Sequence, residues 1–134
     1  MVKLIPGKRG SGKTKLLIDA IHEAARVSKG NVVAIQIGSS LNGSVTHRIG
    51  RLINIEDYKI SGYDALHGFI AGLLASDYDC TDIFIDGLLR IVGRDMERVG
   101  ELISGIIEIS DSTRVTFTIS ADVEDLPEEI KKYL

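Results

Sequence analysis

Apolar runs and amphipathic stretches divide this chain of 134 residues into predicted strands and helices. Short, mostly apolar runs predict strands, and they occur at residues 2–5, 32–37, 82–85 and 113–119, with a weaker candidate at 51–55. Helices are predicted where apolar residues recur at helical spacings, within residues 13–28, after Ser61, and from Asp95 to Ser110. In the first helix, the expected core face is Leu16, Leu17, Ala20, Ile21, Ala24 and Ala25.

Polar residues and glycines predict how two of these helices begin and pack. Ser61, with Asp64 three residues later, has the pattern of a capping box for the second helix. Asp95 is expected to cap the third helix. Gly100 and Gly105 weaken that helix, so a close contact or a bend is expected there. Residues 87–94, just before it, are predicted to be a mostly apolar connection.

A stretch rich in glycine and serine, residues 38–50, follows the second predicted strand and has little periodicity. It is predicted to be a long loop, and long loops in compact domains are often functional. Two interpretations stay open. The loop contacts a substrate or partner through His47, Arg48 and Arg51, or it is a solvated surface segment.

The residues that follow the first strand fit the pattern G-x-x-x-x-G-K-[ST]. Such a loop curls main-chain N–H groups around a phosphate at a helix N-terminus, and its glycines permit the close approach. The lysine ammonium then meets the β and γ phosphates, and the threonine hydroxyl holds Mg²⁺. A chance match is the alternative, but an apolar strand precedes the loop and a helical pattern follows it. The predicted binding residues are Gly7, Lys8, Arg9, Gly10, Ser11, Gly12, Lys13 and Thr14.

On this motif the chain resembles the P-loop NTPase superfamily. The resemblance implies an α/β fold with three αβα layers and a mostly parallel central sheet of about five strands. The segment Asp82–Gly87 resembles the Walker B element, in which Asp86 would hold Mg²⁺ opposite Thr14; the alternative is an acidic turn residue. In the RecA-like branch of the superfamily, a polar residue at the end of this last strand can sense the γ phosphate. Ser120 is the candidate for that role, and the alternative is an ordinary turn hydroxyl.

The guanine-reading N/T-K-x-D motif is absent from the sequence, so ATP is the expected nucleotide by elimination. RecA-like ATPases often have a glutamate directly after the Walker B aspartate, but here that position is Gly87. The possible replacements as general base are Glu56, Asp57, Asp95, Glu97 and Asp122. Arginines that could stabilise transferred phosphate, in cis or across a subunit interface, are Arg90, Arg94 and Arg98; the alternative is that they are solvated charges.

Three functions therefore stay open. The chain is a small Mg²⁺-dependent ATPase with Lys13 and Asp86 as catalytic residues, a phosphotransferase, or a nucleotide-binding switch without turnover. It is expected to form one domain over residues 1–134 and to act as a homo-oligomer or with a protein partner.

Composition narrows the class of protein. Hydrophobic residues make up 44% and charged residues 26%, which is typical of a globular domain. The net charge of −3 argues against non-specific binding to nucleic acid. The single cysteine, Cys80, is expected to be an ordinary packed thiol. The sequence lacks a signal-peptide pattern and an apolar run of membrane-spanning length, so we expect a cytoplasmic protein without membrane contact.

Overall fold

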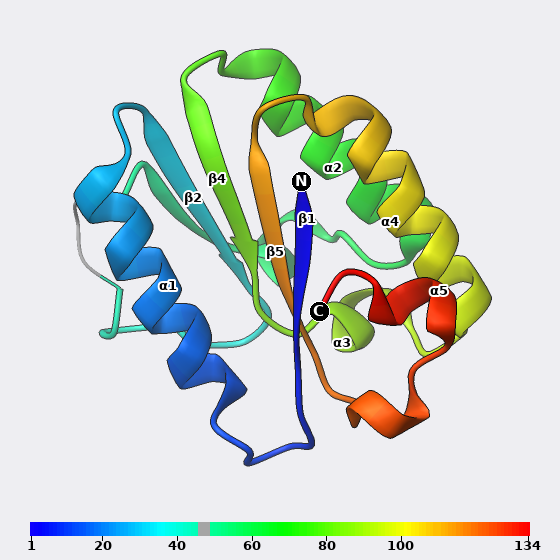
Figure 1. Ribbon diagram of the computed structural model, residues 1–134. Helices are drawn as coiled ribbons and strands as arrows, with labels where there is room; N and C mark the ends of the chain where they lie inside the picture. The colour runs from blue at the N-terminus through cyan, green and yellow to red at the C-terminus, as the bar shows by residue number, and fades with distance from the viewer. Residues whose placement is uncertain (46–48) are drawn as a thin grey trace.

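Parallel strands form the centre of the protein, which the computed structural model describes over residues 1–45 and 49–134 (Figure 1). Within those residues the sheet has five strands in the order β1-β5-β4-β2-β3, and every neighbouring pair is parallel. The bounds are β1 Val2–Pro6, β2 Asn31–Gln36, β3 Arg51–Asn54, β4 Cys80–Ile85 and β5 Arg114–Ile119. The predicted parallel sheet and all five predicted strands, including the weak candidate at 51–55, are confirmed.

Helices cover both faces of this sheet (Figure 1). One face carries α1 (Lys13–Val27), and the other carries α2 (Tyr63–Ser76) and α4 (Met96–Ser110). The three-layer αβα arrangement is therefore confirmed. Shorter pieces complete the described part: the α-helices α3 (Leu88–Val92) and α5 (Glu128–Lys131) and the 3₁₀ turns η1 (Ile55–Tyr58) and η2 (Val123–Asp125). Every helix within residues 1–45 and 49–134 is too short or too polar to span a bilayer.

The alternation of side chains along β2 divides the core into two clusters. On one face of β2, Val32 and Ala34 pack with α1, in the cluster that includes Leu17 and Ile21. On the other face, Val33 and Ile35 belong to the cluster beneath α2 and α4. Both faces of β2 are buried, which explains the continuous apolar run in its sequence.

The helix-face prediction for α1 was wrong at Leu16, which is 57% exposed. Leu17 and Ile21 lie on the buried face, and Leu16 is one helical step of about 100° away from it.

The predicted capping box at Ser61 was also wrong. The residue before α2 is Gly62, with φ 94°, and no side chain caps the helix. The Gly62 N–H instead donates to the Ile91 carbonyl of α3 at 2.9 Å. The 87–94 connection thus contains a helix that the sequence pattern did not predict, and this helix fixes the entry to α2. The predicted cap at Asp95 is confirmed, since its carboxylate accepts from the N–H groups of Glu97 and Arg98.

Gly105 is a point of close contact, as predicted. A Cβ at this position would lie 3.2 Å from the His67 ring, so the glycine lets α4 approach α2. Gly100 has no such neighbour.

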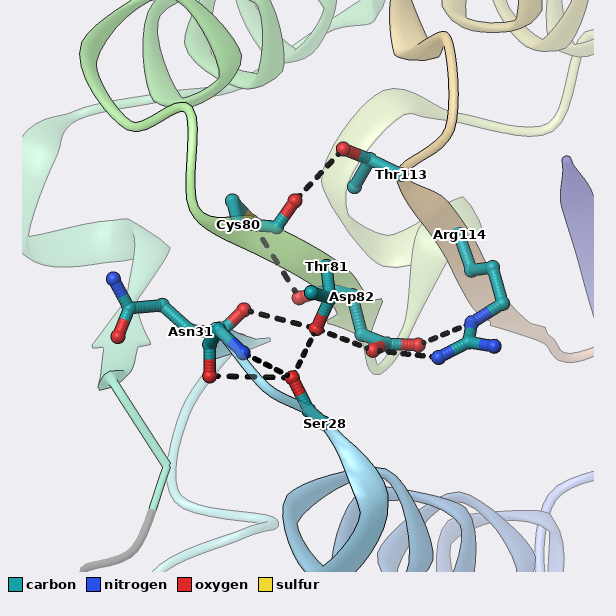
Figure 2. A network of polar contacts seen from close by, with 8 residues as sticks. Ser28, Asn31, Cys80, Thr81, Asp82, Thr113 and Arg114 are labelled. Carbon is teal, nitrogen blue, oxygen red and sulfur yellow. Dashed lines mark hydrogen bonds and ion pairs between the residues drawn. The ribbon is translucent and has the colours of Figure 1, made fainter.

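A network of hydrogen bonds connects the amino ends of β4 and β5 with the end of α1 (Figure 2). Asp82, in β4, is buried, and its carboxylate accepts two hydrogen bonds from Arg114, at 2.8 and 3.1 Å. Thr81 donates to the same carboxylate at 2.8 Å and also meets the Ser28 hydroxyl at the end of α1. The hydrogen bonds to Asp82 raise the pKa of Arg114. This network stabilises the end of the sheet opposite to the one described next.

Candidate functional site

A cavity of about 630 Å³ lies at the carboxyl ends of the strands. Because the strands are parallel, the segments that follow β1, β2, β4 and β5 meet at one edge of the sheet, the usual position of ligand sites in open α/β sheets. Its lining residues are Lys8, Arg9, Gly10, Lys13, Thr14, Ser40, Asp86, Gly87, Arg90, Arg94, Thr118 and Ser120.

The loop from Gly7 to Thr14 forms one wall of this cavity. The Gly7 N–H donates to the Ala121 carbonyl at 3.0 Å, which ties the loop to the end of β5. Gly7 has a φ of 152°, and a Cβ there would collide with the Ser11 hydroxyl, so the turn requires glycine. Gly12 precedes α1 in a left-handed conformation, and no side chain caps the helix. The loop is therefore curled, and it leaves helix N-terminal N–H groups available to an anion.

Lys13 is a buried cation, with 8% of the residue exposed. Its Nζ atom has one hydrogen bond among the described residues, a long one of 3.4 Å to the Lys8 carbonyl. No carboxylate within residues 1–45 and 49–134 forms an ion pair with it. A buried charge normally has a partner of opposite sign, so the position of Lys13 fits an anionic ligand in the cavity.

Thr14 and Asp86 converge although they are 72 residues apart in the sequence. The Thr14 hydroxyl lies 3.3 and 3.4 Å from the two carboxylate oxygens of Asp86. Asp86 directly follows β4 and is 6% exposed. The structure thus brings together the two residues predicted to hold Mg²⁺.

Thr118, in β5, is a site residue that the sequence pattern did not reveal. Its hydroxyl donates to Asp86 Oδ1 at 2.6 Å and accepts from the Gly87 N–H at 2.7 Å. Thr118 is fully buried, so these bonds fix the Asp86 carboxylate and the turn that follows it. Threonine has high strand propensity, so within a β-branched run Thr118 is explained by strand formation alone, and the sequence gives no sign of its hydrogen bonds.

The donor set fits Mg²⁺ only together with phosphate. Among the described residues there is no group of three or more His, Cys, Asp or Glu side chains that could hold a metal. Mg²⁺ usually takes one or two protein oxygens and completes its shell with substrate phosphates and water. Thr14 and Asp86 would supply that protein share, and the curled loop beside them would suit the phosphates.

Ser120 and Arg94 lie together in the cavity wall. An Nη atom of Arg94 donates to the Ser120 carbonyl at 3.1 Å. Arg90 also lines the cavity, but Arg98 does not; its guanidinium stacks 4.5 Å from the centre of the Tyr63 ring. Two of the three predicted arginines are therefore at the site.

None of the carboxylates predicted as replacement bases lines the cavity. Glu56 accepts from the Gly38 N–H at 2.9 Å, Asp95 caps α4, and Asp122 forms an ion pair with Lys8 at 3.1 Å. The hydrogen bond to Asp122 raises the pKa of Lys8. Asp86 is the one carboxylate among the described residues that line the cavity.

Ser40 is the contribution of the 38–50 loop to the cavity. The predicted contacts His47 and Arg48 lie outside the described residues. Arg51 begins β3, at the opposite end of the sheet from the cavity, where it donates to the Tyr58 hydroxyl. The structure therefore does not bring Arg51 to this site.

Cys80 is buried at the start of β4, as predicted for a packed thiol. Burial raises the pKa of its thiol to about 11. The thiol therefore stays protonated at neutral pH, and it lies far from the cavity, at the other end of β4.

The chain matches no model of a known protein family, and no curated protein matches it. A functional assignment must therefore come from the residues of the cavity.

Proposed function

We propose that this protein binds a nucleoside triphosphate with Mg²⁺, with ATP as the expected nucleotide, and hydrolyses its terminal phosphoanhydride bond. The observation that carries the proposal is the convergence of Thr14 and Asp86 beside the buried Lys13, which has no ion-pair partner in residues 1–45 and 49–134. It supports the resemblance of the 7–14 loop and the Asp82–Gly87 segment to the two phosphate-binding elements of P-loop NTPases.

Each residue has a role in this proposal. The N–H groups of the 7–14 loop cradle the phosphates, and Lys13 neutralises charge on the β and γ phosphates. Thr14 and Asp86 would hold Mg²⁺, which neutralises charge that develops during phosphoryl transfer. Thr118 keeps the Asp86 carboxylate in place, and Ser120 lies where it could contact the γ phosphate.

The order of the strands also supports the RecA-like branch. In the sheet, β5 lies between β1, which carries the 7–14 loop, and β4, which carries Asp86. This is the arrangement expected for that branch, in which one strand separates the two phosphate-site strands.

A second function, a nucleotide-dependent switch with little turnover, is favoured by one observation. Asp86 is the one carboxylate on the described cavity wall, and its proposed role is to hold Mg²⁺. A second carboxylate that could orient the attacking water is therefore missing from the described lining. Catalysis would then depend on positioning and charge neutralisation alone, so we expect slow hydrolysis.

Phosphate release from ATP tests the proposal. Lys13→Ala and Asp86→Asn are expected to lower the rate roughly a hundredfold, as loss of a main charge-stabilising group does. Lys15→Ala is the matched control, because Lys15 is exposed on α1 and does not line the cavity. Release by the unmodified protein no faster than by Lys13→Ala would refute the ATPase. Tight ATP binding without release would instead favour the switch.

A further inference from the structure

Arg90 is the single polar residue of α3. The other four residues of this helix, Leu88, Leu89, Ile91 and Val92, are buried and fasten it to the core. Arg90 is exposed and lines the cavity. The short helix α3 is therefore held by its buried apolar side chains, and the guanidinium of Arg90 lies at the carboxyl edge of the sheet.

The guanidinium of Arg90 extends towards the end of β2. An Nη atom lies 4.0 Å from the point where a side chain would begin at Gly38, the second residue after β2. The stem of the same side chain folds against Gly87, after β4. Arg90 therefore bridges the segments that follow β4 and β2, whereas Arg94 turns to Ser120 at the end of β5.

The end of β2, towards which Arg90 extends, lies on the other side of β4 from the strand that carries the 7–14 loop. Adjacent strands lie about 4.8 Å apart, so β1 and β2, three positions apart in the sheet, are roughly 14 Å apart. Asp86 follows β4, the strand between β2 and the β5–β1 side of the sheet. A nucleotide whose terminal phosphate reaches Asp86 would leave the guanidinium of Arg90 one strand further along the edge.

Several hydrogen-bond donors remain at that place. Among the described residues, the Arg90 guanidinium forms no ion pair or hydrogen bond, and no acceptor engages the N–H groups of Ser39 and Ser40. Ser40 lines the same cavity. A carboxylate also reaches this segment, since Glu56 Oε1 accepts from the Gly38 N–H at 2.9 Å. One guanidinium fork with adjacent hydroxyl and amide donors suits a phosphate group.

We propose that Arg90 and Ser40 form a second anion subsite, which binds a phosphate monoester of a second ligand while the nucleotide occupies the 7–14 loop. This proposal rests on the proposed nucleotide site and goes further, because it names a second ligand class. It places that ligand next to the terminal phosphate of the nucleotide, in the same cavity.

Phosphate binding to nucleotide-saturated protein tests this subsite. The protein is first saturated with Mg²⁺ and a β,γ-imido analogue of ATP, and its affinity for the analogue is measured. Inorganic phosphate is then titrated by calorimetry. The unmodified protein is expected to bind phosphate, and Arg90→Gln and Ser40→Ala are expected to weaken that binding, roughly tenfold or more for the arginine. Arg90→Gln should change the affinity for the analogue less than about twofold, because its guanidinium extends towards Gly38, after β2, rather than towards the 7–14 loop.

Arg26→Gln is the matched control, since Arg26 is exposed on α1 and pairs with Glu23. It should change neither affinity. Absence of phosphate binding to the nucleotide-loaded protein would overturn the subsite. Equal weakening of analogue binding by Arg90→Gln would also overturn it, by assigning Arg90 to the nucleotide itself. Failure of the nucleotide proposal is distinguishable, because the unmodified protein would then not bind the analogue in the first titration.

Discussion

The hydroxyl of Thr118 offers a sharp test of how the candidate site is built. Thr118→Val keeps the shape of the side chain and removes two hydrogen bonds, one to Asp86 and one from the Gly87 N–H. Both partners stay in place, but each loses a neighbour in a region from which water is largely excluded, since Asp86 is 6% and Thr118 0% exposed.

The cost follows from these two losses. An unsatisfied buried N–H costs about 1–3 kcal/mol, and a hydrogen bond to a charged group contributes about 1.5–3 kcal/mol. Burial of the methyl group that replaces the hydroxyl offsets roughly 1 kcal/mol of this cost. We therefore expect Thr118→Val to lower the free energy of unfolding by about 1.5–5 kcal/mol.

Urea unfolding of the ligand-free protein measures this change. Thr116→Val is the matched control, because Thr116 lies two residues earlier in β5 and its hydroxyl makes no hydrogen bond with the described residues. A second Thr118→Val measurement in an Asp86→Asn background should show a smaller loss, since the charge is gone. The reasoning is refuted if Thr118→Val and Thr116→Val differ by less than about 0.5 kcal/mol.

Three further predictions follow from the structure. Gly7→Ala should cost about 1–3 kcal/mol in thermal unfolding and abolish nucleotide binding, because of the positive φ and the collision with Ser11; adding Ser11→Gly should restore part of the loss. Arg114→Gln should cost about 2–3 kcal/mol by leaving the buried Asp82 carboxylate without its cation. The Cys80 thiol has its pKa raised from 9.0 to about 11 by burial. The thiol is therefore fully protonated in the folded and unfolded states only well below pH 9. As the pH rises from 9 to 11, ionisation in the unfolded state should lower the free energy of unfolding by about 2 kcal/mol. This loss is expected in the unmodified protein but not in Cys80→Ala.

Each of these predictions has a control within the chain. Gly68→Ala should not destabilise the protein, because Gly68 is helical and a Cβ there meets nothing within 4 Å. Arg26→Gln breaks an exposed ion pair and should cost under about 0.5 kcal/mol; an equal cost for Arg114→Gln would contradict the role of Asp82. A pH dependence that persists between pH 9 and 11 in Cys80→Ala would exclude the thiol as its cause.

Much of the fold was predictable because its signals are local. The apolar runs identified the five strands, and the continuous apolar run in β2 reflects burial on both of its faces. The 7–14 loop could be predicted because its glycines are required by the backbone, as the φ of Gly7 shows. Asp86 could be placed opposite Thr14 only through a resemblance, since their 72-residue separation gives no local signal.

The remaining features depend on tertiary contacts that no short pattern encodes. The helix α3 is five residues long and is stabilised by burial of its apolar side chains, so it has no amphipathic period to detect. The start of α2 is set by a bond from Gly62 to Ile91 rather than by the nearby Ser61. Thr118 acts through a partner 32 residues away, while its own sequence neighbourhood reads as ordinary strand.

The central claim is that the 7–14 loop and Asp86 together hold a Mg²⁺-bound triphosphate. Calorimetric titration of the unmodified protein with ATP, with and without Mg²⁺, tests this claim most directly. We expect binding that Mg²⁺ strengthens, loss of binding in Lys13→Ala, and loss of the Mg²⁺ effect in Asp86→Asn. No heat of binding with ATP, GTP or their diphosphates in the presence of Mg²⁺ would contradict it.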